Sequence, residues 1–127
     1  MSTSVASTAF VLFSSPHTAA AKYRMVIGGH LAGAVAGLLA ILLASYLPLH
    51  QSEIYACGIG LSLLLMTLID ALHPPAAGTA LTIAMVHTSS LSENMLVSFK
   101  VAVVVLMTVI LLIAGHYLLR YWLVNLE

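Results

Sequence analysis

The stretch Asp70-Ala71-Leu72-His73-Pro74-Pro75-Ala76-Ala77-Gly78-Thr79 breaks an otherwise apolar chain. Its two prolines have no backbone N–H, and proline disfavours helical geometry in the residue before it. A helix that arrives from the N-terminal side should therefore end near Leu72. Proline is tolerated in the first turn of a helix, so the second proline is well placed to begin a new helix, with Gly78 and Thr79 in its first turn. The stretch predicts two helices joined by a stiff break.

The composition places this break in a membrane. Of the 127 residues, 61% are hydrophobic and only 6% are charged, and the mean hydropathy is +1.10. A soluble domain needs about 25% charged residues to cover a wetted surface. The formal net charge is zero, which gives no basic patch for a nucleic acid. The single cysteine excludes an intrachain disulfide. The chain is therefore expected to be solvated by lipid.

Apolar runs on both sides of the break predict the fold. Three of them, Val26–Leu47, Ile54–Leu72 and Met95–Val124, reach the length of about 20 residues that a bilayer requires. Two others, Ala6–Phe13 and Ala76–Val86, cover only about half of that thickness. We expect an all-α membrane protein of three full transmembrane helices and two half-helices, broken or re-entrant. Whether the half-helices turn back or cross the membrane is left open by the sequence.

The two half-helices resemble each other. Thr8-Ala9-Phe10 aligns with Thr79-Ala80-Leu81 at an offset of 71 residues, and small residues precede both segments. Such an alignment indicates an internal repeat of span, half-helix and span, although chance similarity between two short apolar strings is the alternative. Interrupted helices in corresponding places of two repeats often indicate a transport site.

Glycine marks one face of the first span. Gly29, Gly33 and Gly37 recur every four residues and form a glycine seam on one side of the helix. Small residues let two helices approach closely in lipid. The partner could be another span or another subunit. A second patch of small residues, Cys57-Gly58 and Gly60-Leu61-Ser62, predicts that the second span packs against the first.

The break also carries the polar groups of a candidate site. A helix that begins at membrane depth presents unpaired N–H groups and a positive dipole end, which together favour a small anion. His73 offers a hydrogen bond or a proton, and Thr79 offers a hydroxyl. Asp70 precedes His73 by three residues, so we expect it on the same helical face, where it would orient or protonate the imidazole. The alternative is that Asp70 lies at the interface and the prolines only end a helix.

Three motifs resemble the HPP family of integral membrane proteins, which is named for the His-Pro-Pro tripeptide. They are His73–Leu81, the small-rich segment Ala6–Pro16 that ends in Ser-Pro, and Ile27-Gly28-Gly29-His30. The family includes nitrite transporters of chloroplasts and cyanobacteria, so the resemblance implies a carrier or channel for a small anion. It also implies that residues 1–127 form one HPP-like transmembrane domain, here without the family's usual first span. Between Ala6–Pro16 and Ile27-Gly28-Gly29-His30 this chain lacks the second proline of the family's Pro-Leu-Ala-Gln-Pro-Arg.

These observations together predict a transporter of a small monovalent anion, most simply nitrite, in a bacterial inner membrane or a plastid envelope. Lys22 and Arg24 would attract the anion, and the resemblance implies that His30 faces the path opposite His73. Lipid, the anion and a second copy of the chain are the expected partners, with no nucleic acid, metal, cofactor or enzymatic activity. The alternative is a non-transporting scaffold or sensor subunit assembled through the glycine seam. The predicted binding residues are His73, Pro74, Pro75, Gly78, Thr79, Asp70, His30 and Thr8.

Overall fold

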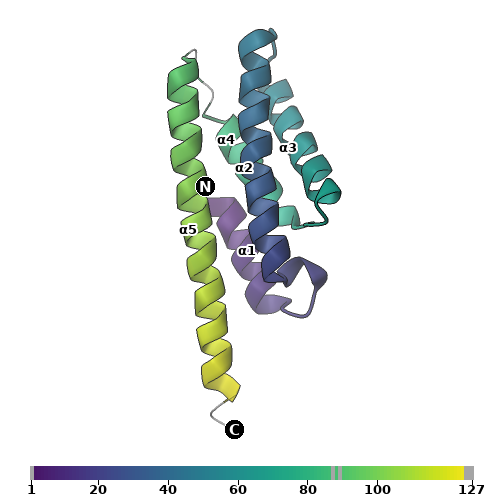
Figure 1. Ribbon diagram of the computed structural model, residues 1–127, viewed down its shortest axis with the longest axis vertical. Helices are drawn as coiled ribbons and strands as arrows, with labels where there is room; N and C mark the ends of the chain where they lie inside the picture. Colours follow the sequence, from purple (N-terminus) through teal and green to yellow (C-terminus); the bar gives the residue numbers. More distant parts are fainter. Residues whose placement is uncertain (1, 87, 89, 125–127) are drawn as a thin grey trace.

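The computed structural model describes residues 2–86, 88 and 90–124, and this part of the chain is helical without strands (Figure 1). Three of its helices are long and apolar enough to cross a membrane, which confirms the predicted all-α membrane fold. The elements are α1 (Ser2–Ser14), η1 (Ala19–Ala21), α2 (Tyr23–Tyr46), α3 (Gln51–Leu68), η2 (Pro74–Ala76), α4 (Ala77–Ala84) and α5 (Leu91–Val124).

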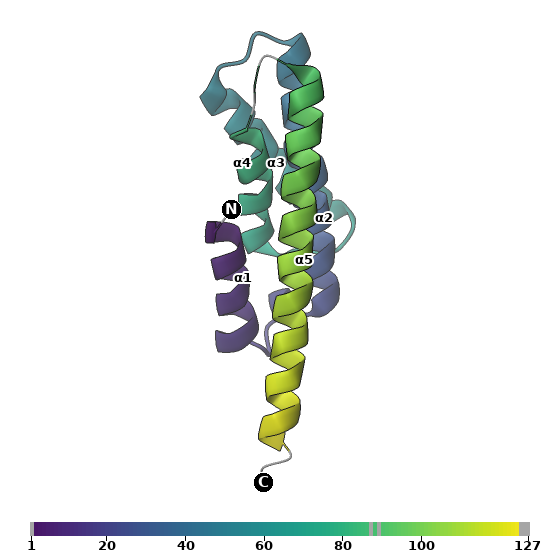
Figure 2. The same cartoon turned by 90° about the vertical axis from the view of Figure 1, so that its left-hand side faces the viewer.

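The two short helices α1 and α4 lie end to end along one side of the bundle, and their N-terminal ends meet about halfway along it (Figure 2). From that point α1 runs down to the level of the lower end of α2 in Figure 1, and α2 then returns along the bundle. The helix α3 comes back down, α4 turns upward beside it, and α5 descends along the whole molecule. The half-helix α4 therefore turns back beside the span that precedes it.

The second span ends earlier than the sequence predicts. Its last helical residue is Leu68 rather than Leu72, because a Schellman turn closes the helix before the prolines are reached. The N–H of Ala71 donates to the Met66 carbonyl over 2.8 Å and that of Asp70 to the Thr67 carbonyl over 3.3 Å. Asp70 itself takes the left-handed conformation with φ of 50°, which Asp adopts at lower cost than most residues.

The glycine seam of α2 packs against the break of the same chain. A Cβ built on Gly29 would lie 2.7 Å from the Cβ of His73, and one on Gly37 would lie 2.8 Å from the carbonyl oxygen of Ala80. At Gly33 the added atom would overlap the carbonyl oxygen of Ala76. The bare face of α2 therefore lets η2 and α4 approach at backbone distance. The sequence left another span or another subunit open as the partner, and in the described chain the seam packs against the link, η2 and the half-helix α4.

The second patch of small residues has a smaller role. The helices α2 and α3 do pack together, and at Gly58 a Cβ would lie 3.6 Å from that of Ala40, an ordinary contact distance. At Gly60 nothing lies within 4 Å, so this glycine does not contribute to the interface. The predicted packing of these two helices is thus confirmed, but only part of the small-residue patch lies in their interface.

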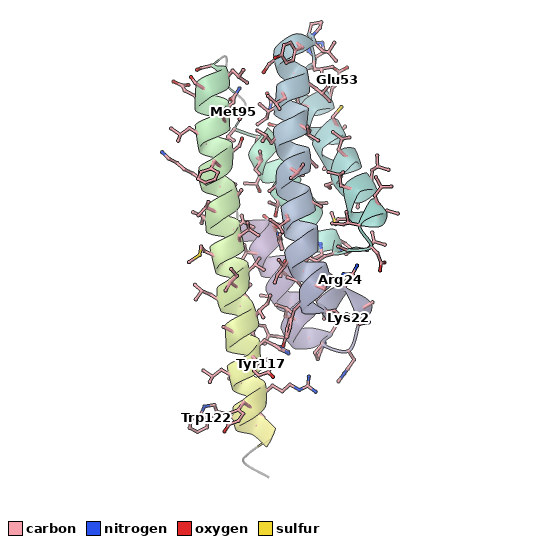
Figure 3. The ribbon with its side chains drawn as sticks, viewed as in Figure 1. Lys22, Arg24, Glu53, Met95, Tyr117 and Trp122 are labelled. Carbon is pink, nitrogen blue, oxygen red and sulfur yellow. The ribbon has the colours of Figure 1, made fainter. Side chains whose placement is uncertain are left out.

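The last helix presents mostly apolar side chains to its surroundings, as Figure 3 shows for Met95, Tyr117 and Trp122. One stripe is an exception, because Val105 and Val109 are buried in a cluster with Leu12 and Val26. This stripe attaches α1 to the long helix and so fixes the position of the first half-helix.

Candidate functional site

Five polar side chains are buried together where the two half-helices meet. Ser4 and Thr8 come from α1, His30 from α2, His73 from the link before η2, and Thr79 from α4. Ser4 retains 3% of its exposure and the other four retain none. Buried polar groups in an apolar protein persist when they find hydrogen-bond partners, and all members of this polar cluster do.

One half of the polar cluster, formed by Ser4, Thr79 and His30, joins the two half-helices to α2. The hydroxyl oxygens of Ser4 and Thr79 are 3.0 Å apart, and the Thr79 hydroxyl lies 2.8 Å from Nδ1 of His30. The hydroxyl of Ser4 is also 2.9 Å from the carbonyl oxygen of Pro75. The first turns of α1 and α4 are therefore held together through side chains.

The other half links the imidazoles of His30 and His73 through the hydroxyl of Thr8. Oγ1 of Thr8 is 2.9 Å from Nε2 of His30 and 3.1 Å from Nε2 of His73, and the ring centroids are 5.4 Å apart. On its other side, Nδ1 of His73 lies 2.9 Å from the carbonyl oxygen of Ala20. Thr8 can also donate to the carbonyl oxygen of Ser4, at 2.9 Å.

These contacts fix where the protons of the neutral cluster lie. A carbonyl oxygen only accepts, so Nδ1 of His73 must donate to Ala20, and Nε2 of a neutral His73 must accept from Thr8. The oxygen of Thr8 then accepts from Nε2–H of His30, whose Nδ1 accepts from Thr79. Five donors thus point the same way along one chain of hydrogen bonds from Ser4 to Ala20, and each group between the two ends both accepts and donates.

This order predicts opposite tautomers for the two histidines. In the neutral protein we expect the Nδ1–H form for His73 and the Nε2–H form for His30, because this pair keeps the Thr8 hydroxyl bonded to both imidazoles, while the carbonyl oxygens of Pro75 and Ser4 then receive no hydroxyl proton. The ¹⁵N chemical shifts of selectively labelled imidazoles distinguish the two forms directly. His116, which stacks on Phe13 outside the cluster, provides the reference signal. The same tautomer at both positions would contradict the assigned chain of hydrogen bonds.

Two threonines of the half-helices flank the same imidazole. Thr8 approaches Nε2 of His30 and Thr79 approaches Nδ1, and the two threonines are the residues that aligned between the half-helices in the sequence. The half-helices run in opposite directions from their meeting point (Figure 2). The arrangement is what an inverted repeat would produce around a shared histidine.

The amides at the start of α4 differ from the expectation. The N–H of Ala76 donates to the carbonyl oxygen of His73 over 2.9 Å, and that of Ala77 bonds within η2. Because the two prolines before them have no N–H, the short 3₁₀ turn uses the donors that were expected to be unpaired. Gly78 is a packing position, since a Cβ there would lie 3.1 Å from that of Ser4. The prediction of unpaired amides at this helix start is therefore wrong for Ala76 and Ala77.

Asp70 does not reach His73, so the predicted role in orienting that imidazole is also wrong. The early end of α3 and the left-handed turn direct its carboxylate to the surface, where its side chain is 81% exposed. It lies 4.0 Å from the guanidinium of Arg24, which is itself 71% exposed and approaches the carbonyl oxygen of Ile69 at 3.4 Å. Lys22 is exposed nearby, and Figure 3 shows both basic side chains around the lower end of α2.

The sequence matches the profile described as "HPP, transmembrane region" over residues 1–123. The chain belongs to the HPP family. A transmembrane protein of Dictyostelium discoideum is 33% identical to it over 82 residues, which are 65% of this chain and 29% of that protein. This HPP chain thus spans less than a third of the length of that relative. No solved structure matches the chain.

An open groove of about 630 Å³ runs beside the polar cluster of this HPP chain. Hydroxyl-bearing residues of α1 and the following loop lie along it together with the His-Pro-Pro prolines. Two of its residues, Ala20 and Pro75, also supply the carbonyl oxygens at the two ends of the cluster. The lining residues are Ser7, Phe10, Val11, Ser15, Thr18, Ala20, Pro74 and Pro75.

The structure adds Ser4 and the carbonyl of Ala20 to the residues that the sequence indicated. Ser4 precedes Thr8 by four residues and therefore lies on the same helical face, a signal that was available in the sequence. The carbonyl of Ala20 had no such signal, because any backbone carbonyl could have served. No third side chain of a metal-ligating type joins the two imidazoles among the residues that the structure describes.

Proposed function

We propose that the chain transports small monovalent anions, with nitrite as the first candidate, along the groove beside the polar cluster. The observation that carries this proposal is the meeting of two oppositely directed half-helices at a buried polar cluster between membrane spans. Non-helical backbone at membrane depth is found where it faces protein or a wet cavity, and here it lines the groove. The family supports a membrane protein of transporter type, and the resemblance to nitrite transporters supports the substrate.

Electrostatics favour an anion over a cation at this position. The N-terminal ends of α1 and α4 converge, and each carries the positive end of a helix dipole, which persists although the first amides of α4 are bonded. Lys22 adds positive charge near the lower end of α2, where Arg24 is paired with Asp70. No carboxylate lines the groove in the part of the chain that the structure describes.

The alternative function, a scaffold assembled through the glycine seam, would need the seam to be free to contact another subunit. Gly29, Gly33 and Gly37 are covered by residues of the link, η2 and α4, so the seam is used inside the chain. We propose instead that a second copy covers the groove. Phe10 stands 66% exposed beside the hydroxyls of Ser7 and Ser15, and hydroxyls facing lipid would lack partners.

Flux into proteoliposomes tests the transport proposal. Vesicles that contain the purified chain should take up nitrite faster than empty vesicles, and nitrate and formate serve as competing anions. Ser7→Phe would place a ring in the groove without touching the polar cluster, so uptake should fall at least about tenfold while folding is kept. Ser52→Phe, on the exposed start of α3, is the matched control. Uptake equal to that of empty vesicles for all three anions would refute the proposal.

A further inference from the structure

The polar cluster has two arrangements of hydroxyl protons, and the second one holds an extra proton. If Nε2 of His73 gains a proton, it donates to the oxygen of Thr8, and the imidazole becomes a double donor to Thr8 and Ala20. The displaced hydroxyl proton of Thr8 turns to the carbonyl oxygen of Ser4 at 2.9 Å, while Nε2–H of His30 still donates to the Thr8 oxygen. The cluster thus accepts a proton without leaving a buried donor unpaired.

His30 accommodates a proton in the same way. With hydrogens on both nitrogens it donates to Thr8 and to Thr79, and the hydroxyl of Thr79 then donates to Ser4. The hydroxyl of Ser4 in turn donates to the carbonyl oxygen of Pro75 at 2.9 Å. For each imidazole, the network therefore contains a carbonyl oxygen that accepts a hydrogen bond from the displaced hydroxyl.

The two states interconvert through Thr8. This exchange requires His30 to hold its own hydrogen on Nδ1 instead of Nε2, a change of tautomer from the neutral cluster. In that form the proton on Nε2 of His73 moves to the oxygen of Thr8 while the hydroxyl proton of Thr8 moves to Nε2 of His30, which then carries hydrogens on both nitrogens. One N–H and one O–H bond break, one of each forms, and Thr8 stays a neutral hydroxyl. Because the ring centroids are only 5.4 Å apart, charge repulsion favours one proton on the pair rather than two.

No other charge lies in the cluster. In the described chain the hydrogen bonds of the two imidazoles go only to Thr8, Thr79 and Ala20. The helices α1 and α4 and the turn η1 contain no titratable side chain. Arg24 and Asp70 pair at the surface. The remaining titratable side chains of the elements packed here, which lie outside the cluster, are Tyr23, Tyr46, Glu53, Tyr55, Cys57, Glu93, Lys100, His116, Tyr117, Arg120 and Tyr121.

We propose that His30 and His73 together bind one proton that travels with the anion. This inference rests on the proposed transport of anions and specifies its coupling ion. An anion at membrane depth has no cationic side chain beside it in the groove, and an uncompensated charge there is costly. A proton on the neighbouring imidazoles supplies the missing positive charge. The proton and the anion then cross the membrane together without net charge.

A pH gradient at clamped potential tests the coupling. With potassium and valinomycin holding the membrane potential at zero, external acid should drive nitrite accumulation above that of empty vesicles, which account for the passive passage of nitrous acid. A potential without a pH gradient should drive none. Thr79→Val removes the hydroxyl between His30 and Ser4 and should lower gradient-driven uptake at least about tenfold. Thr82→Val is the matched control, since the Thr82 hydroxyl donates to the Gly78 carbonyl of its own helix and lies outside the polar cluster.

The outcomes separate the two proposals. Uptake that follows the potential and ignores the pH gradient would overturn proton coupling and leave anion transport in place. Uptake equal to that of empty vesicles would overturn transport itself, and the proton site is then judged without an anion. For that purpose ¹⁵N spectra of the two imidazoles are followed between about pH 4 and 8. Uptake of one proton shared between both rings is expected, and no uptake or two independent protons would overturn the shared site.

Discussion

Gly33→Ala is expected to lower the free energy of unfolding by about 1–3 kcal/mol, the range found for overpacked cores, and Gly33→Val should yield no stably folded protein. The added Cβ would overlap the carbonyl oxygen of Ala76 and stand 3.4 Å from the Cβ of Thr79. Backbone lies on both sides of this contact, so no side-chain rotation relieves it. The helix α4 would have to move away from α2. The loss is measured by thermal unfolding of the purified protein in detergent.

Gly60→Ala is the control for this prediction. Nothing lies within 4 Å of a Cβ at Gly60, and alanine is favoured over glycine inside a helix by roughly 0.5–1 kcal/mol. This variant should therefore unfold at the same temperature as the parent or slightly higher. Equal stability of the two alanine variants would show that the seam is not packed as described.

The fold was largely accessible from the sequence, because in lipid the length of an apolar run nearly decides the element. The ends of the helices were less accessible. The prolines implied that α3 ends at Leu72, but the chain leaves the helix at Leu68 through a left-handed Asp70. Asp is only one of several residues that tolerate this conformation, so nothing in the local sequence singled it out.

The candidate site was predicted in part. His30, His73, Thr8 and Thr79 do meet in one buried cluster, which the repeat of the half-helices and the family resemblance had indicated. Asp70 was misplaced because a one-turn error at the end of a helix moves a side chain from the interior to the surface. The N–H groups of Ala76 and Ala77 were expected to be unpaired, but they bond within the 3₁₀ turn at the prolines. The composition of this stretch does not determine that a 3₁₀ turn forms there.

The glycine seam connects the fold to the site. Gly29 lies against His73, and Gly33 lies against Ala76 in the turn that follows. The close approach of α2 to the break thus brings the imidazole of His30 to within one hydroxyl of that of His73. A bulkier first span would separate the two rings, and the chain of hydrogen bonds between the half-helices would be interrupted. The seam is therefore a condition for the cluster.

His73→Ala is expected to reduce nitrite uptake to the level of empty vesicles and to destabilise the protein. Removal of the imidazole leaves the Ala20 carbonyl without its donor, and an unsatisfied buried group costs about 1–3 kcal/mol. It also opens a cavity against Gly29, and it removes one of the two proton acceptors. Flux and thermal unfolding are measured on the same preparations. Asp70→Asn, whose exposed carboxylate lies outside the cluster, should retain transport.

His73→Asn separates the structural contribution of this histidine from its proton. The amide nitrogen of Asn can take the place of Nδ1 and donate to Ala20, so the unfolding temperature should recover most of what His73→Ala loses. An amide does not accept a proton near neutral pH, and it is too short to replace Nε2 at Thr8. Uptake driven by a pH gradient should therefore remain lost although the protein is folded. Gradient-driven uptake by His73→Asn at the parent rate would exclude His73 from the proton site and leave it a structural residue.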